Sequence, residues 1–274
     1  MNRITRDAKS DGTVGKALEV LDRVAAFGRP VRFGELLEES PFPKATLYRF
    51  VQTLTNQGML SFDAERQTYA PGMRLVRLAH AAWAQSSLAP IARPHVDALA
   101  RETRETVHLA QLDHAQVLYV DKRNAETAVE MYSSAGKIGP AYCTGVGKAM
   151  MAFLPEERLE EIIDQQSFHR FTDETLTDAP SLRRELAAIR AAGYGFDREE
   201  HEPGIICVAV PILTAGQQPI GAISVTSTTA RVTLDDLDAL APRVMTAAQN
   251  IAEEAQHWRF PDQINATFSK TGTV

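Results

Sequence analysis

The sequence predicts an α+β protein, in which an N-terminal winged helix-turn-helix domain precedes a larger domain of strands flanked by helices. Three observations predict this fold. Residues 40–72 have the pattern of a turn, an amphipathic helix and a short β-hairpin. The net charge is positive in residues 1–85 and negative in the rest. After residue 88, strand-like runs and helical segments follow one another, which is typical of an α/β or α+β domain.

The N-terminal head begins with two predicted helices. An apolar stripe indicates the first helix, and it consists of Val14, Leu18, Leu21, Val24 and Ala25. Gly28 to Pro30 break this pattern, and residues 33–39 supply a short second helix. The sequence Ser40-Pro41-Phe42-Pro43 then predicts a turn. Helix, helix and turn is the order that precedes the recognition helix of a helix-turn-helix domain.

The segment after this turn predicts the recognition helix. Four apolar residues have the i, i+3, i+4, i+7 spacing of one buried helix face: Leu47, Phe50, Val51 and Leu54. Gly58 can stop the helix. The opposite face carries cations, hydrogen-bond donors and small residues, which suit phosphates and the base edges of the major groove: Lys44, Ala45, Thr46, Tyr48, Arg49, Gln52 and Thr53.

A β-wing is predicted next, because the runs 59–62 and 67–70 flank the turn 63–66. We therefore expect the head to bind double-stranded operator DNA. The residues expected at the DNA are Lys44, Thr46, Tyr48 and Arg49, with Arg66 at the backbone from the wing. The alternative is an ordinary three-helix domain whose outer face is only solvated. That alternative does not explain why the turn and the wing lie at these distances.

The charge distribution fits a DNA-binding head. The net charge of the whole chain is −6. Residues 1–85 carry 12 Lys/Arg against 9 Asp/Glu (+3), which leaves 17 basic and 26 acidic residues (−9) for the remainder. A cationic head can bind phosphates while an acidic body limits indiscriminate attachment to nucleic acid.

Residues 73–87 predict a linker helix, with an apolar stripe that contains Leu75, Val76, Leu78, Ala79 and Trp83. A single winged domain usually binds DNA too weakly for specific recognition, whereas a dimer reads two half-sites together. The apolar stripe therefore either contributes to a dimer contact or packs on its own domain.

The larger domain contains five predicted helices and six predicted strands. The helices are expected at residues 88–105, 145–153, 155–165 and 181–192 and from Thr233 onward, where Asp235 and Asp236 occupy the first turn. The strands are expected at 107–112, 116–120, 129–132, 194–197, 205–213 and 220–226. The expected domains are thus 1–72, 73–87 as the linker, 88–260 and a tail at 261–274.

Composition narrows the class of protein. The sequence has no apolar run of membrane-spanning length and no leader, so we expect no membrane partner and a cytoplasmic location. Cys143 and Cys207 are too few for a disulfide framework and lack zinc-finger spacing, so we expect reduced thiols. No cofactor and no metal are predicted. The one conceivable exception is a metal held by Asp197, Glu200 and His201.

Several motifs together resemble the IclR-type bacterial transcriptional regulators, over nearly the whole chain. G-K-A-L-E-V-L-D (15–22) and P-K-A-T-L-Y-R-F (43–50) are similar to the first helix and the recognition helix of that family. Y-C-T-G-V-G-K-A-M-M-A-F-L (142–154) resembles its glycine loop and helix. Residues 193–214 resemble the family signature, with Gly193, Asp197, Glu200 and Cys207 at the expected spacings. The chain departs from the pattern at Ala45, where Ser is frequent, and at Leu213-Thr214.

The resemblance implies a homodimer or a dimer of dimers with a C-terminal domain of GAF-like or profilin-like fold. That domain would bind a small organic acid, such as a sugar acid, and so control operator binding. Residues matched to the family motif at the effector are Gly145, Val146, Asp197, Cys207, Ser224 and Thr226. The alternatives stay open: Cys207 can be a core residue, Ser224 and Thr226 can satisfy the backbone, and Asp197 can pair with Arg198 or Arg231.

The residues themselves support an acid-binding site. A helix N-terminus preceded by glycines exposes unpaired backbone N–H groups, so residues 144–147 can hold a carboxylate without a cation. Asp197 and Glu200 are poor partners for a carboxylate but accept hydrogen bonds from hydroxyl groups, which favours a hydroxylated acid.

Other functions are less consistent with the sequence. Residues 145–148 are not a phosphate loop, because Tyr142 replaces the required Gly and Ala149 the required Ser or Thr. A thiol-dependent enzyme that acts on a small acid through Cys207 or Cys143, with His201 as base, is the main alternative. It leaves the head unexplained. A winged helix used for protein contact is a third possibility.

Overall fold

The computed structural model describes residues 12–86, 88–126 and 131–257, and the chain divides into two compact units between Gln85 and Ser86. The expected tail at 261–274 lies outside these residues. None of the described helices combines the length and apolar character that a bilayer crossing requires.

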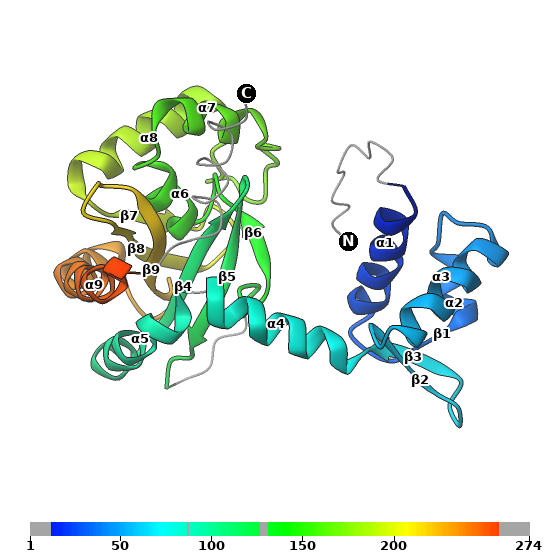
Figure 1. The fold of residues 1–274 in the computed structure, drawn as a ribbon. Coiled ribbons are helices and arrows are strands. Elements are labelled where there is room, and N and C mark those ends of the chain that lie inside the picture. The colour runs from blue at the N-terminus through cyan, green and yellow to red at the C-terminus, as the bar shows by residue number, and fades with distance from the viewer. Residues whose placement is uncertain (1–11, 87, 127–130, 258–274) are drawn as a thin grey trace, which may run out of the picture. The chain divides into compact units, whose positions relative to one another are not determined.

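The N-terminal unit is a winged helix-turn-helix domain followed by a long helix (Figure 1). Its elements are α1 (Gly12–Ala26), β1 (Val31–Arg32), α2 (Phe33–Glu38), α3 (Lys44–Asn56), β2 (Leu60–Asp63), β3 (Thr68–Pro71) and α4 (Met73–Ser86). The three strands form an antiparallel sheet in the order β1-β3-β2. The predicted order of helices, turn and wing is therefore correct, and β1 is an addition to it.

The core of this unit lies between α1, α3 and the sheet. All four residues of the predicted stripe on α3 are buried, together with Leu60 and Tyr69 of the wing strands. The stripe predicted for α1 is only partly correct, because Val14 is 71% exposed and Leu18 is 48% exposed. The core residues of α1, which are Val20, Leu21 and Val24, belong to its C-terminal half.

The wing begins one residue later than the sequence pattern suggests. Asp63 stabilises the turn of the wing, because its Oδ1 accepts hydrogen bonds from the backbone N–H groups of Glu65 at 2.9 Å and Arg66 at 3.0 Å. Gln67 then adopts a left-handed conformation with φ of 54°. The hairpin therefore presents Arg66 at its tip.

The C-terminal unit is built on a six-stranded antiparallel sheet in the order β6-β5-β4-β9-β8-β7. The strands are β4 (Thr106–Asp113), β5 (Gln116–Arg123), β6 (Ile138–Pro140), β7 (Gly195–Arg198), β8 (Ile205–Leu213) and β9 (Pro219–Thr228). The helices are α5 (Ala89–Thr103), α6 (Gly145–Met151), α7 (Glu156–Asp164), α8 (Ala179–Ala192) and α9 (Leu234–Glu254), and a 3-10 turn, η1 (Ala255–His257), follows α9.

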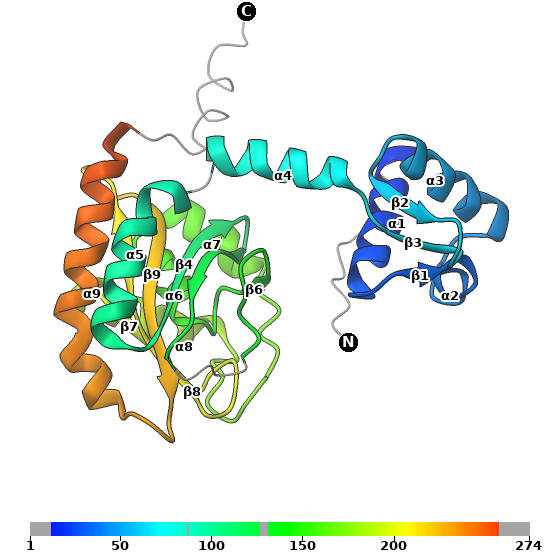
Figure 2. The same cartoon turned by 90° about the horizontal axis from the view of Figure 1, so that it is seen from below.

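Helices cover both faces of this sheet. Figure 2 shows α5 and α9 side by side on one face, with α6, α7 and α8 on the other. Strands flanked by helices are the α+β arrangement that the sequence predicts for this domain. Because both faces are covered, β4, β8 and β9 are buried along most of their length.

Half of the expected strand 129–132 lies outside the described residues. Residues 127–130 are not described, and the described end of the expected strand 129–132, Met131 and Tyr132, is not extended in a sheet. The edge strand beside β5 is instead β6, which pairs Gln116 with Pro140. This three-residue strand has one β-branched residue, Ile138, and no aromatic one, so its own sequence gives little strand signal.

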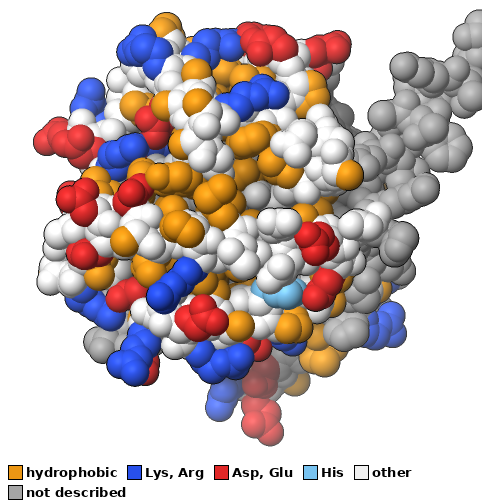
Figure 3. All heavy atoms as spheres, turned by 90° about the vertical axis from the view of Figure 1, so that its left-hand side faces the viewer, with side chains coloured by type: hydrophobic (Ala, Val, Ile, Leu, Met, Phe, Trp, Pro, Cys, Tyr) orange, Lys and Arg blue, Asp and Glu red, His pale blue; other side chains and the backbone are white. Residues whose placement is uncertain are grey.

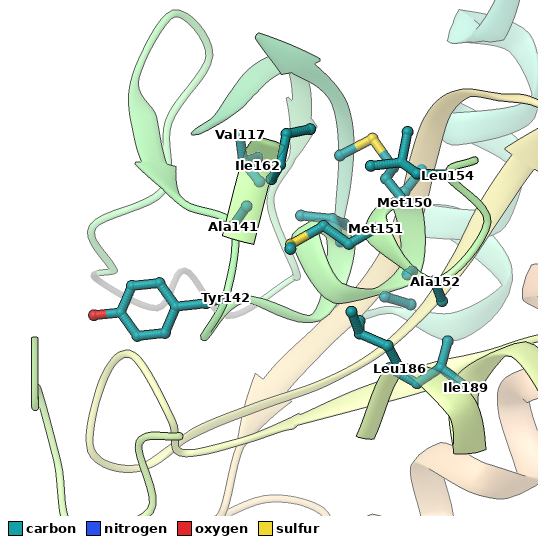
Figure 4. Packing of buried hydrophobic residues seen from close by; sticks show 14 of the residues in the cluster. Val117, Ala141, Tyr142, Met150, Met151, Ala152, Leu154, Ile162, Leu186 and Ile189 are labelled. Carbon is teal, nitrogen blue, oxygen red and sulfur yellow. The ribbon is translucent and has the colours of Figure 1, made fainter. Parts of the chain in front are cut away.

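Helix α6 is the most deeply buried part of the face of the sheet that α6, α7 and α8 cover, because all seven of its residues are buried. Met150 and Met151 lie among apolar side chains near Leu154, and Leu186 of α8 approaches Ala152 just beyond the helix (Figure 4). The helix is shorter than the predicted segment 145–153, and it begins directly at Gly145.

The outer side of α9 and the edge strand β7 carry hydrophobic side chains between charged groups (Figure 3). Met245 of α9 is 40% exposed and lies beside Gly193, whose added Cβ would be 3.5 Å from the Met245 Cε. The rings of Tyr194 and Phe196 contact each other, with centroids 5.7 Å apart.

Candidate functional site

The outward face of α3 is open to a partner in the described N-terminal unit. Lys44, Tyr48 and Arg49 are exposed, and Thr46 is half-buried. Neither Lys44 nor Arg49 belongs to any ion pair found among residues 12–86. Their charges are therefore available to phosphate groups, which is what a DNA-contacting helix requires.

Local contacts hold the side chains of this face in position. The hydroxyl of Tyr48 accepts a hydrogen bond from Gln52 Nε2 at 3.2 Å, and its ring meets the edge of Phe33 at 5.8 Å. At the wing, the Arg66 side chain is 79% exposed, and its Nε lies 4.0 Å from Asp63 Oδ2. An ion pair of that length and exposure leaves the guanidinium free to contact a phosphate.

The C-terminal unit contains a cavity of about 30 Å³ between the sheet and the start of α6. All six residues that the family resemblance selected line it: Gly145, Val146, Asp197, Cys207, Ser224 and Thr226. The other lining residues are His108, Tyr119, Ser133, Thr144, His201, Glu202 and Ile205. Such a volume holds about one or two water molecules, so a larger ligand requires the lining to move.

The floor of the cavity is a row of polar side chains set by strand register. Asp197 of β7 lies opposite Cys207 of β8, which lies opposite Thr226 of β9. Two residues along, Ser224 of β9 lies opposite His108 of β4. Since alternate residues of a strand share a face, the register brings these five side chains to the α6 side of the sheet.

The roof of the cavity is the first turn of α6. Gly145 brings this turn close to the sheet, and Gly147 brings it close to the backbone of Ala141. A Cβ at Gly145 would lie 2.4 Å from the Sγ of Cys207, and a Cβ at Gly147 would lie 2.3 Å from the carbonyl oxygen of Ala141. Neither position tolerates a side chain. The glycines therefore let the unpaired N–H groups of the first turn face the cavity at short range.

Asp197 is the buried acid of the cavity. Its Oδ1 accepts the backbone N–H of Glu200 at 2.8 Å. Burial raises the pKa of Asp197 to about 7, and the neighbouring Glu200 carboxylate acts in the same direction. Asp197 forms no ion pair with Arg198 or Arg231, which pair with Glu185 and Glu105.

Glu200 does not line the cavity but binds a buried cation that the sequence analysis did not select. Lys148 of α6 is completely buried, and its Nζ contacts Glu200 Oε1 and lies 3.3 Å from Glu185 Oε1. Burial raises the pKa of Glu200, and Lys148 opposes that shift. The signal for this pair was a lysine in the otherwise apolar helix G-V-G-K-A-M-M, which needs a buried counter-charge.

His108 extends the polar floor into a chain of hydrogen bonds. Its Nδ1 lies 3.1 Å from Thr226 Oγ1, and its Nε2 lies 2.8 Å from Ser133 Oγ. Burial lowers the pKa of His108 to about 3, with Lys122 adding to the effect, so the ring is neutral. Tyr119 packs against this ring with centroids 5.4 Å apart, and burial raises the pKa of its hydroxyl.

The site does not suit the chemistry of a thiol enzyme. Cys143 and Cys207 are both buried and free. Burial raises the pKa of Cys207 to about 12, with Asp197 adding to the effect, and burial also raises the pKa of Cys143. A thiol of such pKa supplies almost no thiolate nucleophile at neutral pH.

A metal site formed by Asp197, Glu200 and His201 is also disfavoured, because Glu200 is not free to act as a ligand. Glu200 is held by Lys148, as described above. Within residues 12–86, 88–126 and 131–257, no three His, Cys, Asp or Glu side chains are arranged to hold a metal ion.

Two domain families match the chain. The profile described as "Bacterial transcriptional regulator IclR C-terminal" matches residues 80–253, and the profile described as "IclR helix-turn-helix domain" matches residues 13–64. Among curated proteins, the chain is 31% identical over 255 residues to the HTH-type transcriptional regulator KdgR of Dickeya chrysanthemi, covering 92% of this chain and 84% of that protein. It is 28% identical to the transcriptional repressor IclR of Escherichia coli, with coverage of 86% and 87%.

Solved structures share the fold. The IclR of Thermotoga maritima matches with a TM-score of 0.73 at 29% identity, covering 89% of this chain and 98% of that one. An IclR homologue from Microbacterium hydrocarbonoxydans, complexed with 4-hydroxybenzoate, matches with a TM-score of 0.77 at 23% identity, with coverage of 90% and 100%.

Proposed function

The chain belongs to the IclR family of bacterial transcriptional regulators, and we propose that its operator binding is controlled by a small carboxylic acid held in the cavity under α6. As a member of this family it is a DNA-binding regulator with a ligand-binding C-terminal domain, and not an enzyme. The observation that carries the proposal is the cavity itself, in which the first turn of a buried helix faces hydroxyl, thiol and carboxyl groups.

The carboxylate of the effector binds the first turn of α6, at Gly145 and Val146. Backbone N–H groups at a helix N-terminus stabilise an anion without a cation. Cys207, Ser224 and Thr226 contact the rest of the ligand from the floor, and Asp197 contacts its hydroxyl or carboxyl group. The 4-hydroxybenzoate complex of a structural relative supports an acid ligand. For this chain we propose a hydroxylated acid, such as a sugar acid.

A thermal-shift screen tests the class of effector. Sugar acids, keto acids and 4-hydroxybenzoate are compared with their uncharged amides at equal concentration. An acid that binds the folded protein raises the melting temperature by mass action, whereas its amide does not. Equal shifts from acid and amide would contradict carboxylate recognition. Enzymes encoded beside the gene would then narrow the choice of acid.

Operator recognition is assigned to α3 and the wing. Lys44, Thr46, Tyr48 and Arg49 enter the major groove, and Arg66 contacts the backbone. Their exposure supports this assignment. Electrophoretic mobility shift on the promoter upstream of the protein's own gene tests it, because Arg49→Ala is expected to abolish the specific shift. Arg243→Ala removes the same charge from an exposed position of α9 and serves as the matched control.

The active assembly is a homodimer or a dimer of dimers, since two linked heads read two half-sites. Large apolar side chains are exposed on α1 and α4, and they are Val14, Leu18, Met73, Val76 and Leu78. Contact with a second copy would remove them from water. Light scattering coupled to size exclusion measures the assembly, and a monomer at working concentration would contradict this part of the proposal.

A further inference from the structure

Asp197 brings a buried carboxyl group to the cavity. The side chain is 7% exposed and lines the cavity. Its Oδ1 accepts the backbone N–H of Glu200 at 2.8 Å, and none of the ion pairs found among the described residues includes Asp197. A buried carboxyl group that lines a cavity and has no ion-pair partner can form a hydrogen bond with a ligand atom.

Lys148 lowers the pKa of Asp197 from a distance but forms its ion pairs with other carboxylates. Lys148 contacts Glu200 and Glu185, and Arg198 lies 2.8 Å from Glu185. These two cations are therefore matched by two other carboxylates. The remaining titratable groups that face Asp197 or share its cavity are Cys207 on β8, Cys143 before α6, His108 on β4, Tyr119 on β5, and His201 and Glu202 after β7. Glu202 lies 3.7 Å from His201, so those two groups also pair with each other.

A bound acid adds a second carboxyl group to this small space. The backbone N of Asp197 lies 3.3 Å from the position that a Cβ at Gly145 would occupy, so Asp197 adjoins the first turn of α6. Two ionised carboxylates in a cavity of about 30 Å³ repel each other strongly. One proton between them removes the repulsion and creates a short hydrogen bond from O–H to O⁻.

We propose that the cavity takes a monocarboxylate together with one proton, which Asp197 and the ligand share, and that Asp197 thereby selects an acid over its neutral analogue. This inference rests on the proposed function. The pKa of Asp197, about 7, supports it, because at neutral pH about half of the free protein already carries the proton. The neutral hydroxyl of Tyr119 adds a second donor to the cavity without adding charge.

Titration calorimetry with glycerate and with 4-hydroxybenzoate between pH 6 and 8.5 tests the inference. The Kd is expected to be constant below pH 7 and to weaken by about tenfold per pH unit above it, because the bound state retains a proton that the free state has lost. Calorimetry in two buffers of different ionisation enthalpy at pH 8 is expected to report the uptake of about one proton per acid bound. Acid binding with a flat pH profile and no proton uptake would overturn the inference and leave the proposed function intact.

The variant Asp197→Asn separates a proton donor from an ionised acceptor. An amide donates a hydrogen bond at every pH, so this variant is expected to bind both acids with no dependence on pH. Ser224→Ala changes an uncharged side chain of the same cavity, and it is expected to weaken binding while it keeps the wild-type pH profile. Retention of the pH profile in Asp197→Asn would overturn the assignment of the proton to Asp197.

Infrared spectroscopy checks the proton without a ligand. The difference spectrum between pH 6 and pH 8 is expected to contain the C=O band of a protonated carboxyl group, and Asp197→Asn is expected to lack it. An unchanged band in the variant would overturn the assignment. If the band belongs to Asp197 but neither acid binds, the proposed class of effector is wrong and the shared proton is wrong with it.

Discussion

Gly145 determines how closely the anion-binding turn approaches the sheet. A Cβ at this residue would lie 2.4 Å from Cys207 Sγ and 3.3 Å from Ala209 Cβ. Gly145→Ala is therefore expected to push the first turn of α6 away from β8. We expect a loss of about 1–3 kcal/mol in the free energy of unfolding, measured with urea, and weaker binding of acids in the thermal-shift assay.

Two further variants isolate the steric cause of this effect. Gly216→Ala adds the same methyl group where its nearest neighbour is Thr214 Oγ1 at 3.8 Å, so it is expected to be close to neutral. Adding Cys207→Ala to Gly145→Ala removes the clashing sulfur. If the double variant is no more stable than the sum of the two single changes predicts, the clash with Cys207 is not the cause.

His108 makes the free energy of unfolding of the C-terminal unit depend on pH in the acidic range. Its pKa is about 3 in the folded protein against 6.5 for the free side chain. Below pH 6.5 the unfolded state binds a proton at His108 that the folded state does not take up. The contribution of neutral His108 to the free energy of unfolding is therefore complete above pH 6.5 and is lost as the pH falls below it. We expect the free energy of unfolding of the wild type to fall by about 2–3 kcal/mol more than that of His108→Gln between pH 6.5 and 4.5.

Asp197 is expected to change the free energy of unfolding with pH in the opposite direction, and so it provides the control. Its pKa rises from 3.8 to about 7 on folding, so ionisation favours the unfolded state as the pH increases through this range. Relative to Asp197→Asn, the wild type should lose stability as the pH rises from 4 toward 7.

Urea titrations at several pH values test the His108 prediction. Parallel profiles of the free energy of unfolding for the wild type and His108→Gln would show that His108 is not buried in its neutral form.

The residues of the cavity were predictable only through the family motifs. Glycines, a cysteine and hydroxyl residues far apart in sequence have no spacing that brings them together, whereas the sheet register does so directly. Tyr119 and His108 were missed because an aromatic or a lone histidine in a strand is usually a core residue. Lys148 was missed because it was considered only as part of a phosphate loop.

At the scale of elements, the recognition helix and the wing contribute differently to DNA binding. A phosphate contact weakens all sequences equally, whereas a base contact discriminates among them. Arg66→Ala is therefore expected to lower affinity for specific and nonspecific DNA alike and to reduce the slope of log K against log salt by about one. Arg49→Ala is expected to narrow the ratio of specific to nonspecific affinity. Fluorescence anisotropy over roughly 50–200 mM salt measures both effects.

A variant that removes one positive charge from the C-terminal unit supplies the reference for this comparison. Arg243→Ala, on exposed α9, is expected to leave both the salt slope and the specificity ratio at wild-type values. A loss of specificity in Arg66→Ala as large as that in Arg49→Ala would show that the wing reads bases and not only the backbone.

Long periodic elements were predicted well, and short ones were not. The bounds of β8 were exact, and α8 and α9 begin within two residues of their predicted starts. β1 contains only Val31 and Arg32, so no periodicity marks it, and it exists because Val31 pairs with Tyr69 of the wing. β6 was missed for a similar reason: its position depends on pairing with β5 and not on its own residues.

At the scale of the whole molecule, the split of charge between the two units serves their separate roles. The positive head is attracted to phosphate, while the excess of acidic residues after residue 85 disfavours contact of the body with DNA. The same acidic body also disfavours anions in general. Recognition of a carboxylate therefore depends on local donors, at α6 and at the floor of the cavity, and not on the overall field.

Control of the operator by an acid requires that the two binding events change each other's affinity. We infer a shift between two populations, in which the bound acid changes the subunit packing and thus the spacing of the paired recognition helices. If the acid changes operator affinity by some factor, the operator must change acid affinity by the same factor, typically about 5–150-fold. Anisotropy with and without acid gives the first factor, and calorimetry with and without a duplex operator gives the second. A factor of one in both measurements would show that the cavity does not control the head, even if each unit binds its own ligand.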